Sequence, residues 1–139
     1  MSTAATVTAV ESELRLVAHP SQLGLARGLA EEAAAGFGFD DEETHAFTFA
    51  VNEAVSNSIE HGSPFPDGTI LLEMTVEDGA LTARVTDCGD FVPGLPKTEA
   101  LPDRGRGLAF MAVMVDEVEL KPCPDRTVVR LAKRRSQEG

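Results

Sequence analysis

The amino-acid sequence predicts an α+β domain in which helices cover one face of a mixed, mostly antiparallel sheet. Three observations support this expectation. A short strand is followed by two helices, an Asp-Gly hairpin signal joins the next two strands, and two more strands follow a third helix. Strands and helices grouped in this way, rather than alternating as βαβ units, favour two layers.

The chain begins with one strand and one helix. Residues 13–18 alternate between apolar and polar side chains and are expected to form a strand. Pro20 and Ser21 offer a helix start, and the segment up to Ala35 is rich in Leu, Ala and Glu. Two glycines, Gly36 and Gly38, are expected to end this helix.

A second, longer helix follows. Asp40 and Asp41 are suited to cap it, and two glutamates lie favourably in its first turn. The helix should run to His61 and stop at Gly62, with prolines just beyond.

The second half of the chain is expected to be mostly strand. Residues 69–76 and 81–86 form a hairpin around Glu77-Asp78-Gly79. Residues 88–106 contain three prolines and are too long for a simple connector, which indicates a functional loop. A third helix over 107–115 then leads to two last strands, 116–120 and 127–132, around a turn at 122–125.

Size and composition suit one globular domain. The 139 residues predict a single domain with its core at about 12–133 and flexible ends. The net charge of −11 argues against direct binding of nucleic acid. Six of the 12 basic residues lie in the last 19 positions, and we interpret them as an ordinary strand followed by a solvated tail. Without a signal peptide or a membrane span, a cytoplasmic protein with reduced Cys88 and Cys123 is expected.

The second helix carries the most informative pattern. Its predicted core face consists of Phe47, Val51, Ala54, Val55 and Ile59. Glu53, Asn57 and His61 follow at a spacing of four residues and so form a neighbouring stripe, on which Ala46 and Ala50 leave room. Such a stripe is typical either of a solvated surface or of a ligand cavity. The run of poor helix formers around Asn57 favours the cavity.

Two further patterns are weak when taken alone. Asp87-Cys88-Gly89 lies at the end of a strand, and an aspartate there with a glycine two residues later is common in turns. Gly105-Arg106-Gly107-Leu108 precedes an apolar helix, where backbone amides can approach phosphate oxygens, but a flexible loop end would look the same. The chain has no P-loop motif, and its Gly-x-Gly does not follow the first strand of a βαβ unit.

In this order, the three patterns resemble the ATP-binding boxes of the GHKL superfamily. Within it they are most similar to the bacterial anti-sigma factor serine kinases. Glu53-x-x-x-Asn57-x-x-x-His61 resembles the N box, Asp87-x-Gly89 the G1 box and Gly105-x-Gly107-Leu108 the G2 box. The resemblance extends from Leu14 to Lys133 and implies the GHKL (Bergerat) fold, a two-layer α/β sandwich.

The resemblance implies a role in ATP binding or catalysis for each residue of the N box and for Asp87 of the G1 box. Glu53 would be the general base, and Asn57 would supply an oxygen ligand to Mg²⁺. His61 completes the N box, although a histidine at a helix C-terminus is more often a favourable cap. Asp87 would accept a hydrogen bond from the adenine 6-amino group and so reject guanine.

The remaining matched residues would surround the base and the phosphates. Gly89 would let the backbone pass close to the base, while Gly105, Gly107 and the amide of Leu108 would wrap the phosphates. Residues 91–104 would form the ATP lid. Arg104 and Arg106 would either neutralise the γ-phosphate or be exposed lid charges.

One departure from the family pattern concerns the last strand. The family usually has Gly-Thr there, and this chain has Arg126-Thr127. Thr127 matches, whereas Arg126 replaces the glycine and puts the shape of the pocket floor in question.

The implied function is that of a kinase and an anti-sigma factor. The protein would bind Mg-ATP, phosphorylate a serine or threonine of an anti-anti-sigma (STAS-type) partner, and sequester a sigma factor as a homodimer. A first alternative is a non-catalytic ATP-binding module that acts only by partner binding. A second is a histidine kinase catalytic domain. It would need a phosphoacceptor histidine on a separate hairpin, and His19 and His45 are too isolated to serve.

Overall fold

The computed structural model describes residues 12–62, 64–88, 111–123 and 125–136. In chain order the elements are β1 (Ser12–Val17), the short 3-10 helix η1 (Pro20–Gln22), α2 (Leu23–Phe37), α3 (Asp41–His61), β2 (Thr69–Glu77), β3 (Ala80–Asp87), β4 (Glu117–Cys123) and β5 (Arg126–Lys133). Residues 111–114 add a helical turn before β4. Residues 89–106 of the predicted loop over 88–106 and the start of the predicted third helix lie outside the described residues.

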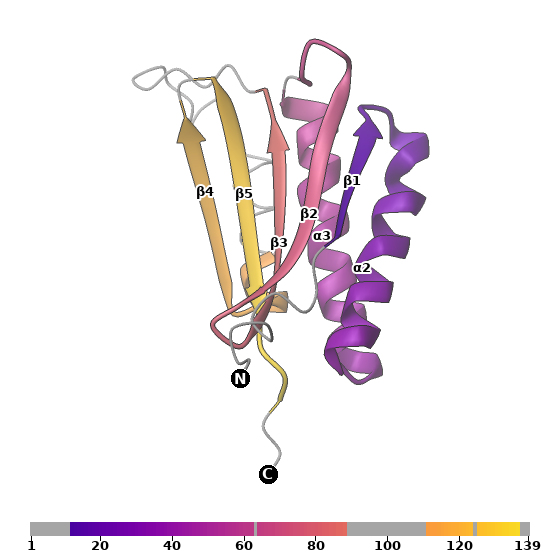
Figure 1. The fold of residues 1–139 in the computed structure, drawn as a ribbon, viewed down its shortest axis with the longest axis vertical. Helices are drawn as coiled ribbons and strands as arrows, with labels where there is room; N and C mark the ends of the chain where they lie inside the picture. Colours follow the sequence, from indigo (N-terminus) through magenta and orange to yellow (C-terminus); the bar gives the residue numbers. More distant parts are fainter. Residues whose placement is uncertain (1–11, 63, 89–110, 124, 137–139) are drawn as a thin grey trace, which may run out of the picture.

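The five strands form one antiparallel sheet in the order β1-β2-β3-β5-β4. Figure 1 shows α2 and α3 side by side on the same face of this sheet. The predicted α+β fold class is therefore confirmed, and every neighbouring pair of strands is antiparallel.

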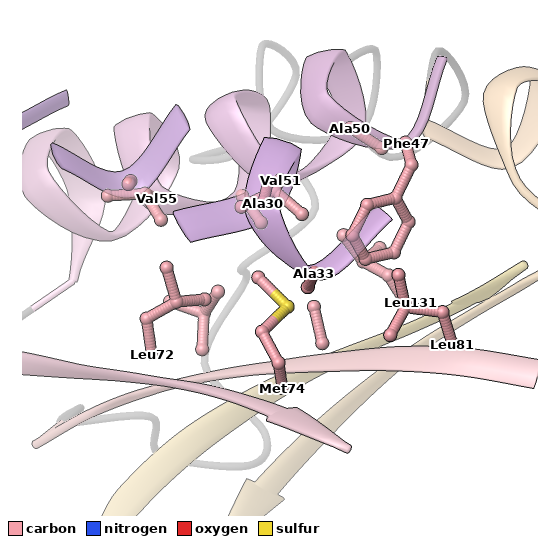
Figure 2. Close-up of a cluster of buried hydrophobic side chains, with 14 of the residues drawn as sticks. Ala30, Ala33, Phe47, Ala50, Val51, Val55, Leu72, Met74, Leu81 and Leu131 are labelled. Atoms are coloured by element: carbon pink, nitrogen blue, oxygen red, sulfur yellow. The ribbon is translucent and has the colours of Figure 1, made fainter. Parts of the chain in front are cut away.

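The core fills the space between the two helices and the sheet. In Figure 2, Leu72 and Met74 of β2 point toward Ala30 of α2 and Val51 of α3. The predicted core face of α3 is confirmed, with Ile59 partly buried at its edge. Ala50 was expected on the polar stripe, where it would leave room, but it is completely buried and belongs to the core. The apolar arc of α3 is wider than the sequence predicted because α2 covers a second side of the helix.

The predicted hairpin and helix ends are largely confirmed. Asp78 and Gly79 both have positive φ, 52° and 77°, as a two-residue primed turn requires. Helix α2 continues two residues beyond the predicted end and stops at Gly38, whose φ of 99° is left-handed.

The last turn of the sheet is shorter than predicted. Strand β4 does not stop at Leu120 but continues through Pro122 to Cys123. A proline usually interrupts a strand because it cannot donate a ladder hydrogen bond. It is tolerated here because β4 lies at the edge of the sheet.

The end of α3 that begins at Asp41 is tied to the C-terminal segment. The side chain of Asp40 accepts a hydrogen bond from the amide of Glu43, and the Glu43 carboxylate accepts one from the amide of Asp40, which forms a capping box. The same Glu43 carboxylate also accepts a hydrogen bond from the amide of Ser136. The guanidinium of Arg135 donates to the Phe37 carbonyl at 2.8 Å and lies 4.7 Å from the centre of its ring. Arg135 and Ser136 are therefore hydrogen-bonded to the helical layer, whereas Arg134 bonds to Asp116 before β4. All three residues are exposed, as a solvated tail predicts, but they are held in place by these contacts.

The other face of the sheet carries charged side chains. Arg130 of β5 pairs with Glu117 and Glu119 of β4 and with Glu77 of β2, which also pairs with Arg84 of β3. These cross-strand ion pairs explain why this face needs no helical cover. Among the described residues, no helix is long and apolar enough to cross a membrane.

Candidate functional site

Helix α3 holds Glu53, Asn57 and His61 on successive turns. Glu53 and Asn57 are half-buried, whereas His61 is exposed and lies 3.6 Å from the carboxylate of Glu60. Within the described part of the chain, the side chains of Glu53 and Asn57 make no hydrogen bond. The open hydrogen-bonding capacity of a half-buried polar group can be met by water or by a ligand. The arrangement therefore leaves a carboxylate and an amide oxygen available one helical turn apart.

Asp87 lies at the end of β3 on the helix-covered face of the sheet. Its position continues the alternation of Ala83 and Val85, which point into the core. Asp87 is only 3% exposed, and its backbone is in register with Thr127 of β5, which is also buried. A carboxylate at this depth can present its oxygens only to groups that enter the space between β3 and α3.

The ends of α3 and β3 meet at Gly62. A Cβ atom added at Gly62 would lie 2.3 Å from Oδ2 of Asp87, so the carboxylate fills the place of a side chain. The end of α3 and the end of β3 lie at the same end of the molecule (Figure 1), so the candidate adenine reader lies beside the end of the helix that carries Glu53 and Asn57. From the sequence, Gly62 is expected only to stop the helix. The contact with Asp87 could not be predicted from the residues around Gly62, because Asp87 lies 25 positions away in the sequence.

Arg126 lies on the face of the sheet opposite the candidate site. Its side chain borders a hollow of about 380 Å³ together with Leu71, Arg84 and Val128, whereas Thr127 points toward the helices. Its backbone does not have the positive φ that would call for a glycine. The Arg126 side chain therefore does not enter the space between β3 and α3.

Six predicted site residues lie outside the described residues: Gly89, Arg104, Gly105, Arg106, Gly107 and Leu108. The same holds for the predicted lid. The structure places Asp87 beside Thr127 and against the end of α3, with His61 exposed on its last turn. Asn57 lies one turn before His61, and Glu53 lies near the middle of the helix. A separate hollow of about 680 Å³ lies at the opposite end of α3, beside Glu43, Met114 and Lys133. It contains none of the predicted site residues.

An antiparallel five-stranded sheet with α2 and α3 on one face matches a GHKL-like ATPase fold. The model of the histidine kinase-like ATPase domain family matches residues 16–133. The chain belongs to this family.

Relatives in this family are similar to the chain at low identity. The serine-protein kinase RsbW of Bacillus pumilus is 27% identical over 124 residues, covering 78% of this chain and 76% of the relative. An anti-sigma F factor of Clostridium botulinum is 34% identical over 95 residues, covering 61% of this chain and 66% of the relative. These matches confirm the resemblance to the anti-sigma factor serine kinases.

A solved structure shows the same fold. It contains the RsbU and RsbW domains of Rv1364c from Mycobacterium tuberculosis and superposes with a TM-score of 0.72 at 23% identity. The match covers 93% of this chain but only 33% of that one, so the chain spans about a third of the solved protein.

Proposed function

We propose that this chain binds Mg-ATP and transfers the γ-phosphoryl group to a serine or threonine of an anti-anti-sigma (STAS-type) protein. The proposal includes a cytoplasmic homodimer that sequesters a sigma factor. The observation that carries it is the pair of half-buried groups without partners, Glu53 and Asn57, on the helix whose end contacts the buried Asp87. The names of the relatives, a serine-protein kinase and an anti-sigma factor, support the choice of acceptor and partner.

Each described residue has a task in this reaction. Glu53 would take the proton of the acceptor hydroxyl while the hydroxyl oxygen forms a bond to the γ-phosphorus. The bond between the γ-phosphorus and the β,γ-bridging oxygen breaks at the same time, and ADP leaves. Asp87 would hold the adenine and so fix the position of the nucleotide.

The donor at Asn57 fits a magnesium ion. Mg²⁺ prefers oxygen ligands and is usually bound through one or two protein groups together with substrate phosphates and water. The ion would neutralise charge on the phosphates, and Asn57 would orient it.

If Asn57 binds the ion, Asn57→Ala should bind ATP equally well with and without Mg²⁺, while the wild type gains affinity when Mg²⁺ is added. A normal response of the variant would assign Asn57 to the solvated surface instead.

The decisive experiment is incubation with Mg-[γ-³²P]ATP and the candidate anti-anti-sigma proteins encoded in the same genome, beside a pull-down of sigma factors. We expect phosphoserine or phosphothreonine on one candidate. Partner binding with no phosphorylation of any candidate would favour the non-catalytic module. The position of Arg126 removes one argument for that alternative, because its side chain lies on the other face of the sheet.

A further inference from the structure

Gly62 differs from the other glycines that the structure describes. Gly28 and Gly36 of α2 have no atom within 4 Å of an added Cβ, and Gly38 has the left-handed backbone of a helix end. At Gly62 the backbone is extended, with φ −90° and ψ 176°, which any residue adopts. The glycine is therefore required by space and not by backbone freedom.

The space in question is occupied by the carboxylate of Asp87. An added Cβ would lie 2.3 Å from its Oδ2 and 2.8 Å from its Cγ, and 2.9 Å from the carbonyl oxygen of Ser58. The first two distances lie far inside van der Waals contact. The side chain of Asp87 and a side chain at position 62 therefore cannot occupy their present places together.

The backbone of Asp87 cannot easily move to relieve such a clash. Asp87 is paired with Thr127 in the ladder between β3 and β5, and this ladder continues along the whole of β3. The clashing atoms belong to the end of the Asp87 side chain, which can move more readily than the paired backbone. A methyl group at position 62 would thus shift the carboxylate while leaving the strand in place.

We infer that Gly62 is a positioning residue for Asp87, and that the preference for adenine over guanine depends on its missing side chain. This inference rests on the proposed function, in which Asp87 recognises the adenine 6-amino group. Hydrogen-bond recognition fails when an acceptor moves by more than a few tenths of an ångström from its distance range of about 2.7–3.2 Å. Because Gly62 ends the helix that carries Glu53 and Asn57, the same contact sets the distance between the adenine end and the phosphate end of the site.

The test compares Gly62→Ala with the control Gly36→Ala, which adds the same methyl group in open space. Calorimetric titration with ATP and GTP should show at least a roughly tenfold loss of ATP affinity in Gly62→Ala. The ratio of ATP affinity to GTP affinity should fall by the same factor. Gly36→Ala should keep both. In an Asp87→Ala background, adding Gly62→Ala should cause little further loss of ATP affinity, because the carboxylate that it displaces is gone.

The outcomes separate this inference from the proposed function. A wild type that binds neither nucleotide overturns the proposed function and the positioning role with it. A wild type that prefers ATP, together with a Gly62→Ala variant that keeps the same preference, overturns only the role of Gly62. If Gly62→Ala does not fold, recovery of folding in the Gly62→Ala, Asp87→Ala double variant supports the contact. If the double variant does not fold either, the glycine is required by its closeness to the Ser58 carbonyl and not by Asp87, which overturns the inference.

Discussion

The two ends of helix α3 carry similar polar groups and use them differently. At the end that begins at Asp41, the carboxylates of Asp40 and Glu43 accept hydrogen bonds from backbone amides. Toward the other end, Glu53 and Asn57 are half-buried and have no such partners among the described residues. Polar groups whose partners are built into the fold stabilise it, and polar groups left open are available to a ligand. We therefore expect substitutions at the first end to change stability and substitutions at the second to change chemistry.

The largest expected effect is that of Glu53→Ala on phosphoryl transfer. General-base catalysis contributes about 10²–10⁴-fold, so the rate of phosphorylation should fall by roughly that factor while ATP affinity is retained. Glu42→Ala, which removes an exposed glutamate at the other end of the same helix, should leave the rate unchanged. Rates of ³²P transfer to the anti-anti-sigma partner measure both. Full kinase activity in Glu53→Ala would place the base elsewhere.

The next effect concerns nucleotide affinity. Asp87→Asn can turn a donor toward the adenine amino group, and the loss of a charged acceptor costs about 1–3 kcal/mol, roughly 5- to 150-fold in Kd. Titration calorimetry with ATP and GTP measures this loss. Equal affinity of the wild type for the two nucleotides would show that Asp87 does not read the base.

A smaller effect on stability is expected at the capped end of α3. Asp40→Ala removes the capping box and should lower the free energy of unfolding by about 1 kcal/mol, with the Kd for ATP unchanged. Asp41→Ala, one residue further on and without a capping hydrogen bond, serves as the control in urea unfolding. If both variants lose the same stability, the effect belongs to charge near the helix terminus and not to the cap.

The smallest effect is a pH dependence at the same end. Hydrogen bonds from the amides of Asp40 and Ser136 hold the pKa of Glu43 below its ordinary value. A carboxyl whose pKa is lowered by folding stabilises the native state above its unfolded pKa and loses this contribution as pH falls through the folded pKa. Unfolding curves recorded from about pH 6 down toward pH 3 should therefore be less pH-dependent in Glu43→Gln than in the wild type. Curves that remain parallel would refute a role for this carboxyl.

The elements of α3 were predictable because their signals are local. The cap at Asp40, the core face and the stop at Gly62 all follow from residues within a few turns of one another. The hairpin at Asp78-Gly79 was predictable for the same reason, since its turn requires two positive φ values.

The features that were missed depend on neighbours distant in sequence. Pro122 was expected to end a strand, and only the order of strands shows that β4 is an edge. The burial of Ala50 depends on where α2 lies. The contact between Gly62 and Asp87 depends on the approach of a helix end to a strand end. The candidate site residues came from the order of three motifs, and the structure adds that the residue after the first motif lies against the aspartate of the second.

The attachment of Arg135 and Ser136 also affects how the chain completes its fold. The hydrogen bonds from Arg135 to Phe37 and from Ser136 to Glu43 join positions 98 and 93 residues apart. During synthesis, the junction between the two helices therefore lacks these partners until residues 135 and 136 have been translated. Contacts of such long sequence separation form late and slow folding. A shortened C-terminus should consequently produce a chain that assembles its sheet but holds its helices less firmly.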